Sequence, residues 1–187
     1  MNLQIKNKKL DGIISLEDKS NLIVASFITS NILGNRIKIE KTSDRTINLN
    51  KSLINLFLLI TVKGGKINLE TMEEFLPLFL TTASFAVAKT TFVGVDVASK
   101  ISVDTINVLK QLGALIEVEE DLVMVDGRGI VKGTAVDCTG LDNGIIFALI
   151  VAGTVSYGEI ILENVIESAE LKEFLQIFES LGGEVNF

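Results

Sequence analysis

The sequence predicts an α/β fold turned inside out, in which three repeated strand–helix units bury helices at the centre and place sheets around them. The segments Ser99–Gly113 and Ser168–Gly182 share one layout, because each begins with serine, ends with Leu-Gly and has the same length. Three strongly apolar stretches also recur along the chain, at Leu22–Leu33, Phe75–Ala88 and Ile145–Val155. A helix that is apolar nearly all round is expected to be buried on every side. Three such helices in one small chain therefore belong at its centre.

Each unit is expected to run strand, apolar helix, strand, amphipathic helix and a further strand. Two of the amphipathic helices are expected to start after Ser99 and Ser168, because serine is a favoured N-cap. The first unit leaves Asn50–Val62 open, as either helix or strand. The period of roughly 60 residues divides a single domain, residues 1–187, into units of about 10–65, 66–130 and 131–187. The expected strands lie at Gly12–Leu16, Arg36–Thr42, Lys66–Glu70, Thr90–Ala98, Thr134–Asp137 and Glu159–Glu167.

Composition and charge narrow the class of protein. The 187 residues suit a single domain, and 48% of them are apolar, with a mean hydropathy of +0.45. The apolar runs Leu53–Val62 and Phe75–Ala88 are shorter than the roughly 20 residues that span a bilayer, and the first ten residues lack the apolar stretch of a signal peptide. A net charge of −7 disfavours nucleic acid and anionic membranes as partners. We therefore expect a cytoplasmic protein that binds neither.

Few side chains are available for chemistry. The chain has no histidine and one cysteine, so an internal disulfide is impossible and the commonest metal ligand is missing. We expect no cofactor and no metal, and acid–base steps would use carboxylates, lysine or the one tyrosine. Lys19, followed by Ser20, stands where a strand is expected to pass into a helix. Backbone N–H groups and the helix dipole favour an anion at such a junction.

The start of the chain resembles a known signature. Residues 10–20, LDGIISLEDKS, are similar to the strand and Gly-Asp-Lys-Ser that open 3-phosphoshikimate 1-carboxyvinyltransferase, with Glu17 in place of the glycine. Ser43-Asp44 is similar to a Ser-Asp or Ser-Glu step of that enzyme, and residues 121–185 resemble UDP-N-acetylglucosamine 1-carboxyvinyltransferase. The resemblance to the enolpyruvyl-transferase family covers nearly the whole chain. It implies one lobe of a two-lobed fold, in which each lobe has three units with buried helices and outer sheets.

The resemblance also implies roles for individual residues. It makes Lys19 the catalytic lysine, which binds substrate and offers a proton, and Ser20 a phosphate ligand. The substrate-binding residues that it implies are Lys19, Ser20, Ser43, Asp44, Arg45, Lys100, Asp142 and Asn143. Structural alternatives stay open at several of them. In the first alternative, Asp18 caps the helix and Lys19 lies in solvent. In the others, Asp142 and Asn143 only cap their helix, and Arg45 and Lys100 are surface charges.

Two segments depart from the family pattern. Residues 77–88, PLFLTTASFAVA, stand where the family has an Asn-Ala-Gly-Thr segment with its arginine. The tripeptide Ser99-Lys100-Ile101 stands where the family has an Arg-Pro pair. Lysine keeps the positive charge of arginine but does not reproduce its bidentate fork. The chain therefore has fewer groups for an anionic substrate than the family pattern implies.

Two functions remain open at this point. In the first, the chain is a lobe that transfers the carboxyvinyl group of phosphoenolpyruvate to a hydroxyl acceptor such as shikimate 3-phosphate, a reaction of aromatic amino acid biosynthesis. The resemblance then implies a second lobe, or self-association, to complete the cleft. In the second, the chain is a diverged, non-catalytic relative that acts as a binding or interaction domain. The retained Asp-Lys-Ser favours the first function, and the shortage of arginine together with the negative charge favours the second.

Overall fold

The computed structural model describes residues 1–40, 44–128 and 131–186, and of residues 44–50 it describes the backbone alone. Three pairs of parallel strands organise the chain. These pairs are β2 (Asp11–Ile14) with β3 (Arg36–Ile39), β4 (Gly65–Asn68) with β5 (Lys89–Val93), and β8 (Ala135–Asp137) with β9 (Ile160–Glu163). A helix joins the two strands of each pair, and a second helix follows the pair. The joining helices are α1 (Asn21–Ile32), α3 (Leu76–Phe85) and α5 (Asn143–Gly153), and the following helices are α2 (Asp44–Val62), α4 (Lys100–Gln111) and α6 (Ala169–Ser180).

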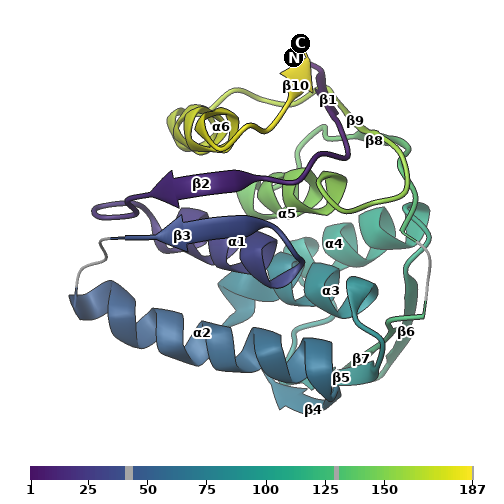
Figure 1. Ribbon diagram of the computed structural model, residues 1–187. Helices are drawn as coiled ribbons and strands as arrows, with labels where there is room; N and C mark the ends of the chain where they lie inside the picture. Colours follow the sequence, from purple (N-terminus) through teal and green to yellow (C-terminus); the bar gives the residue numbers. More distant parts are fainter. Residues whose placement is uncertain (41–43, 129–130, 187) are drawn as a thin grey trace.

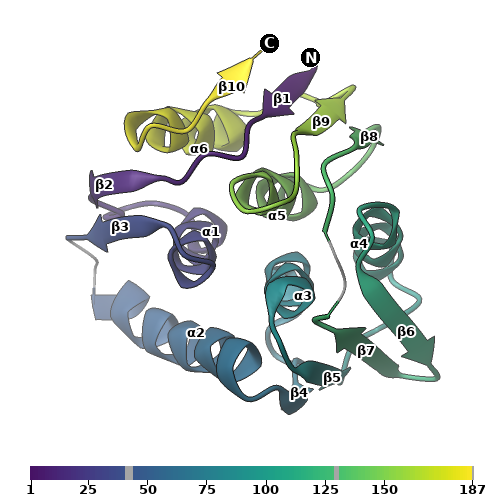
Figure 2. The same ribbon diagram turned by 45° about the vertical axis from the view of Figure 1, so that its right-hand side comes forward.

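The joining helices α1, α3 and α5 form the centre of the molecule, and the strands lie around them (Figure 2). Every residue of α5 from Gly144 to Gly153 is buried. Some hydroxyl groups inside this layer donate to carbonyls of their own helix, as Thr82 Oγ1 does to Leu78 O at 2.8 Å, whereas Thr29 Oγ1 and Thr81 Oγ1 are buried without a hydrogen-bond partner among the described residues. No helix in the described part of the chain is both long and apolar enough to cross a membrane. The structure thus agrees with the predicted arrangement of buried helices and outer sheets.

Two four-stranded sheets have the same strand order. One runs β4-β5-β7-β6, and its outer strands β6 (Leu115–Glu119) and β7 (Leu122–Asp126) form a hairpin. The other runs β8-β9-β1-β10, with β1 (Leu3–Ile5) antiparallel to both β9 and β10 (Val185–Asn186). In this second sheet β1 takes the place that β7 takes beside β5. The first and last strands of the chain therefore lie side by side (Figures 1 and 2).

The first strand pair is built differently. After β3 the chain forms the long helix α2, which includes residues 50–62, so this segment is helix and not strand. Its buried residues Leu53, Phe57 and Ile60 recur at helical spacing, and the ring of Phe57 lies 4.7 Å from that of Phe79 on α3. Among the described residues, β2 and β3 form a sheet of two strands only. The chain passes from α2 directly into β4.

All three strand pairs are parallel, and each of the six α-helices in the described part of the chain comes after the carboxyl end of a strand, with a short 3-10 helix (Glu73–Phe75) between β4 and α3. The helices of one pair therefore begin on the same side of that pair. The starts of the three central helices also meet, because a Cβ on Gly144 would lie 3.6 Å from Leu22 of α1 and 3.7 Å from Pro77 of α3. We call the surface formed by residues 16–23, 72–77, 99–104, 140–144 and 168–173 the helix-start face.

Candidate functional site

Lys19 and Ser20 lie in the tight loop between β2 and α1. Asp18 has a positive φ of 60°, and Lys19 N donates to Leu16 O at 3.4 Å, so the chain reverses sharply here. Ser20 caps α1, since its Oγ accepts from Ile23 N at 3.2 Å. The alternative in which Asp18 caps this helix is therefore wrong. Lys19 and Ser20 stand at the positive end of the α1 dipole, as their position in the sequence predicts.

Both residues contact α6 from across the helix-start face. Lys19 Nζ lies 2.7 Å from Glu173 Oε1, in an ion pair whose side chains are 28% and 41% exposed. Ser20 Oγ donates to Glu170 Oε1 at 2.6 Å. Ser168 caps α6 in turn, accepting from Leu171 N at 3.1 Å. The loop before α1 is thereby tied to the first two turns of α6.

Asn143, the first residue of α5, joins the same group. Its Nδ2 donates to Glu170 Oε2 at 3.1 Å and to Ser168 Oγ at 3.2 Å. Asp142 caps α5, since its Oδ1 accepts from Gly144 N at 2.8 Å. The carboxylate of Glu170 therefore receives one hydrogen bond from the start of α1 and one from the start of α5. Lys19, Ser20 and Asn143, all predicted as ligands, form one cluster with these two carboxylates.

Lys100 lies on the other side of the start of α5. Its Nζ donates to Gly140 O at 2.8 Å and pairs with Asp104 on its own helix. Between α4 and the loop before α5 there is a cavity of about 350 Å³. It is lined by Lys100, Ile101, Asp104, Gly140, Leu141 and Asp142. The structure therefore brings Lys100 and Asp142, which the sequence predicts as ligands, to the same cavity.

The remaining predicted ligands belong to the start of α2. Asp44 and Arg45 are its first two residues, and the structure describes their backbone alone. Ser43 lies outside the described residues. Figure 1 shows the start of α2 at the same end of the molecule as the loop that follows β2. Their part in a site stays a prediction.

The helix-start face is negatively charged overall, because its eight carboxylates outnumber its three lysines, at positions 19, 100 and 172. Each of these lysines is paired with a carboxylate of this chain. The helix starts and the hydroxyl and amide donors favour an anion there. An anionic ligand that binds to Lys19 has to displace the carboxylate of Glu173. The lysines that would recognise an anion are therefore already paired within this chain.

The prediction from sequence missed Glu170 and Glu173. Both lie in the first two turns of a helix that is expected to begin after Ser168. The chain topology is what could have pointed to them. Parallel strand pairs place the helix starts on one side, so an acidic residue in the first turn of one helix comes near the start of another helix. The topology identifies Glu170 and Glu173 in particular only once α6 is known to pack beside α1.

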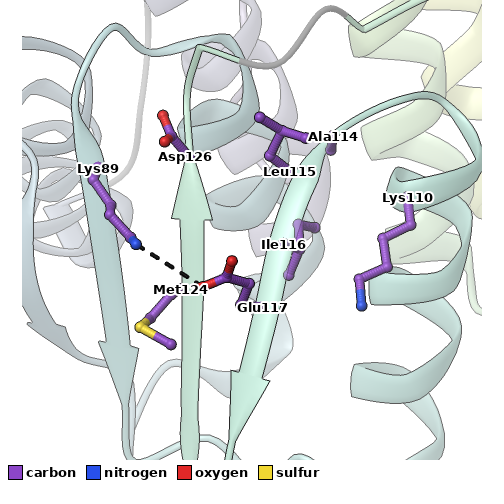
Figure 3. Close-up of a pocket in the computed structure, with 8 residues that line it drawn as sticks. All are labelled: Lys89, Lys110, Ala114, Leu115, Ile116, Glu117, Met124 and Asp126. Carbon is purple, nitrogen blue, oxygen red and sulfur yellow. Dashed lines mark ion pairs between the residues drawn. The ribbon is translucent and has the colours of Figure 1, made fainter.

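A second cavity, of about 430 Å³, lies on the outer surface of the sheet β5-β7-β6 (Figure 3). Lys89 points across it to Glu117, at 4.0 Å, and Lys110 faces it from α4. Lys110 is about 15 Å along the helix from Lys100, so this cavity is at the far end of α4. It contains none of the residues that the sequence predicts as ligands.

Cys138 is a buried thiol rather than a reactive one. Its side chain is packed in the core, and burial, with lesser contributions from Asp137 and Glu163, raises its pKa to about 12. The nucleophilic thiolate is therefore scarce at neutral pH. Cys138 therefore fills space in the core.

Comparison with protein families places this arrangement in a known group. The family model for EPSP synthase (3-phosphoshikimate 1-carboxyvinyltransferase) matches residues 24–187. The match begins after Lys19 and Ser20, so it does not include these two residues. A sequence search of curated proteins gave no match.

Solved structures share the fold. The enolpyruvyl transferase NikO from Streptomyces tendae has a TM-score of 0.68 at 14% identity, over 89% of this chain and 44% of that chain. EPSP synthase from Acinetobacter baumannii has a TM-score of 0.68 at 15% identity, over 95% of this chain and 48% of that chain. This chain thus spans less than half of either structure, and the predicted inside-out α/β fold is confirmed. Because the family model matches most of its residues, the chain belongs to the EPSP synthase family.

Proposed function

We propose that the chain supplies one half of an enolpyruvyl-transferase cleft, with the helix-start face as its contribution. The observation that carries the proposal is the cluster of Lys19, Ser20 and Asn143 where three helices begin. These side chains come from two segments far apart in the sequence, yet they converge on two neighbouring carboxylates of α6, Glu170 and Glu173. A second lobe, or a second copy of the chain, would close the cleft over this face.

The proposed reaction transfers the carboxyvinyl group of phosphoenolpyruvate to a hydroxyl acceptor such as shikimate 3-phosphate. The acceptor hydroxyl gives its proton to a carboxylate of the partner lobe while its oxygen forms a bond to C2 of phosphoenolpyruvate and C3 takes a proton, which gives a tetrahedral intermediate. The C2–O bond to phosphate then breaks, C3 returns a proton, and inorganic phosphate leaves. Lys19 would hold an anionic oxygen and supply the proton, and Ser20 and Asn143 would donate hydrogen bonds to phosphate oxygens.

The other predicted ligands would extend this site. Lys100 and Asp142 line the cavity of about 350 Å³ beside the start of α5, which is large enough for part of a small anionic ligand. Asp44 and Arg45, with Ser43, would add polar groups at the start of α2. The partner lobe would have to supply further cations, because this chain has three arginines in all.

A second function has its own support. In a non-catalytic relative, the same face would serve as a binding surface for a protein or a small ligand. The pairing of both Lys19 and Lys100 with carboxylates of the same chain favours this alternative. The two departures from the family pattern, at residues 77–88 and at Ser99-Lys100-Ile101, also favour it.

Calorimetric titration with phosphoenolpyruvate and with shikimate 3-phosphate, alone and together, tests the proposal. We expect binding that weakens by about tenfold or more in Lys19→Ala, since a charge-assisted hydrogen bond is lost. Lys110→Ala is the matched control, because it removes a lysine at the far end of α4 and should leave binding unchanged. Absence of binding at millimolar ligand, both for the chain alone and with a second lobe added, would favour the non-catalytic alternative.

A further inference from the structure

The two carboxylates of α6 occupy the part of the helix-start face that is best suited to an external anion. Glu170 accepts from Ser20 Oγ at 2.6 Å and from Asn143 Nδ2 at 3.1 Å, so both of its oxygens are engaged. Glu173 holds Lys19 at 2.7 Å. The donors around them are a hydroxyl, an amide and an ammonium group. These are the donors that a phosphate or carboxylate ligand uses in a protein site.

The neighbouring helices reinforce this position. Neither α1 nor α5 carries an acidic residue in its first turn, although Asp142 caps α5. The positive ends of both helices therefore face the carboxylate that α6 brings to them. Glu170 is itself in the first turn of α6. The carboxylate of Glu170 thus lies at the starts of three helices. A bound anion at this position would be stabilised by all three helix dipoles.

The packing of α6 holds these carboxylates in place. Phe174, which follows Glu173, stacks on Phe147 of α5 with ring centroids 4.4 Å apart and on Phe27 of α1 at 5.1 Å. All three rings are fully buried. Because the aromatic stack fixes the second turn of α6, the two carboxylates are presented to α1 by the fold and not by chance rotation of a surface helix.

We propose that Glu170 and Glu173 are specificity-determining residues that act as built-in competitors for the anion subsite formed by Lys19, Ser20 and Asn143. The subsite then discriminates against ligands of high negative charge, because such a ligand must displace one carboxylate and remain close to the other. A phosphorylated ligand is admitted only when the cleft adds enough cations to offset them. This inference rests on the proposed function, since it describes the charge selection of the same site.

Inorganic phosphate is the probe for this inference, titrated at low ionic strength into the wild type and the double variant Glu170→Gln/Glu173→Gln. Glutamine keeps the size of each side chain and removes its charge. We expect the double variant to bind phosphate at least about fivefold more tightly, as is reasonable for a partly exposed ion pair that no longer competes. The single variant Glu173→Gln, which leaves the hydrogen bonds of Glu170 intact, should show a smaller gain.

Two controls give the result its meaning. Glu179→Gln removes an exposed carboxylate near the other end of α6 and should bind phosphate as the wild type does. Adding Lys19→Ala to the double variant should abolish the gain. The inference is overturned if the double variant binds phosphate no more tightly than the wild type, including the case in which neither binds. It is also overturned if Glu179→Gln gains as much, or if the gain survives without Lys19.

The same variants separate this inference from the proposed function. Tighter phosphate binding that depends on Lys19, without any binding of phosphoenolpyruvate, would support the competing carboxylates and contradict the transferase. Phosphoenolpyruvate binding that depends on Lys19 and is equal in the wild type and the double variant would support the transferase and contradict the competition. Thermal melts of each variant check that the aromatic stack still holds α6.

Discussion

The two ends of the central helix layer use the same kind of side chain in opposite ways. At the carboxyl end, Asn35 is 4% exposed; its Nδ2 donates to Thr154 Oγ1 at 3.0 Å, and its Oδ1 accepts from Leu10 N at 2.6 Å. At the helix-start face, Asn143 is half-buried and donates to Ser168 and Glu170. Both asparagines join one central helix to other segments. Only the second does so with partners that a ligand is able to replace.

At the carboxyl end of the central helices the polar contacts are buried and structural, whereas at the helix-start face a ligand is able to replace them. Asn35 also donates to Ser30 O at 3.0 Å, so its polar atoms are satisfied inside the protein. At the other end, side chains with partial exposure hold one another through charge and hydroxyl contacts. Such contacts contribute little net stability because water competes for them. The predictions below test this contrast, beginning with the buried layer between the two ends.

The largest effect is expected from a charge placed in that buried layer. Phe147→Asp would remove a ring that stacks on Phe174 and bury an unpaired carboxylate in α5. We expect a loss of about 5 kcal/mol or more, which is comparable to the whole stability of a small domain. Urea unfolding followed by circular dichroism measures it. A cooperative transition near that of the wild type would show that α5 is not central.

The two asparagines provide the direct comparison. Asn35→Ala would leave Leu10 N without a partner in a buried place, and we expect it to cost about 2 to 4 kcal/mol. Asn143→Ala should cost less than about 1 kcal/mol, since water reaches its partners. Denaturant midpoints of the two variants give both values. Equal costs would remove the distinction between the ends.

The helix caps at the helix-start face should have intermediate effects. Ser168→Ala and Ser99→Ala each remove a hydroxyl that caps a helix, and each should cost about 1 kcal/mol. The Ser168 variant also removes a partner of Asn143, so it should alter phosphate binding, whereas the Ser99 variant should not. Chemical denaturation together with phosphate titration separates the two effects. A change in phosphate binding in both variants would mean that the whole face responds as one unit.

The smallest effect is expected from an ion pair near the far end. Arg128 donates to both carboxyl oxygens of Asp126, at 2.9 Å and 2.6 Å, and lowers the pKa of Asp126 to about 2. A lowered pKa in the folded state gives stability that is present above the unfolded value near 4. This stability is lost as the pH falls from about 4 toward 2.

Melting temperatures of Asp126→Asn between pH 6 and pH 2 test this linkage. The variant should be slightly less stable than the wild type at pH 6 and equal to it near pH 2. The difference should be small, because Arg128 is exposed and water screens the pair. A difference between the two proteins that grows toward low pH would contradict the sign of the linkage.

Much of the fold follows from local patterns. The apolar stretches predict α1, α3 and α5, and serine spacing predicts the caps Ser99 and Ser168, since hydrophobic period and capping act within a few residues. The segment after position 50 remained ambiguous, because its apolar run suits either a helix or a strand until its contacts with α3 are known. The pairing of β1 with β9 lies beyond any local pattern, because the two strands are nearly the whole chain apart.

The site divides in the same way. The strand-to-helix junction at Lys19 and Ser20 can be predicted locally, because the favourable backbone geometry belongs to one loop. Glu170 and Glu173 cannot be, since their role depends on how the Phe174 stack turns α6 toward α1. Nor can the sequence show that Lys100 reaches Gly140. Residues whose chemistry depends on packing between helices need the structure.

The position of β1 has a consequence for synthesis of the chain. Leu3 and Ile5 are fully buried, but their partners in β9 and β10 are made about 150 residues or more later. At ordinary translation rates, roughly ten to thirty seconds pass between the appearance of β1 and that of β9. During this interval two apolar side chains and an unpaired strand edge stay open to water and to other nascent chains. A slowly translated message, or a shortage of chaperone, would therefore favour aggregation through this sheet.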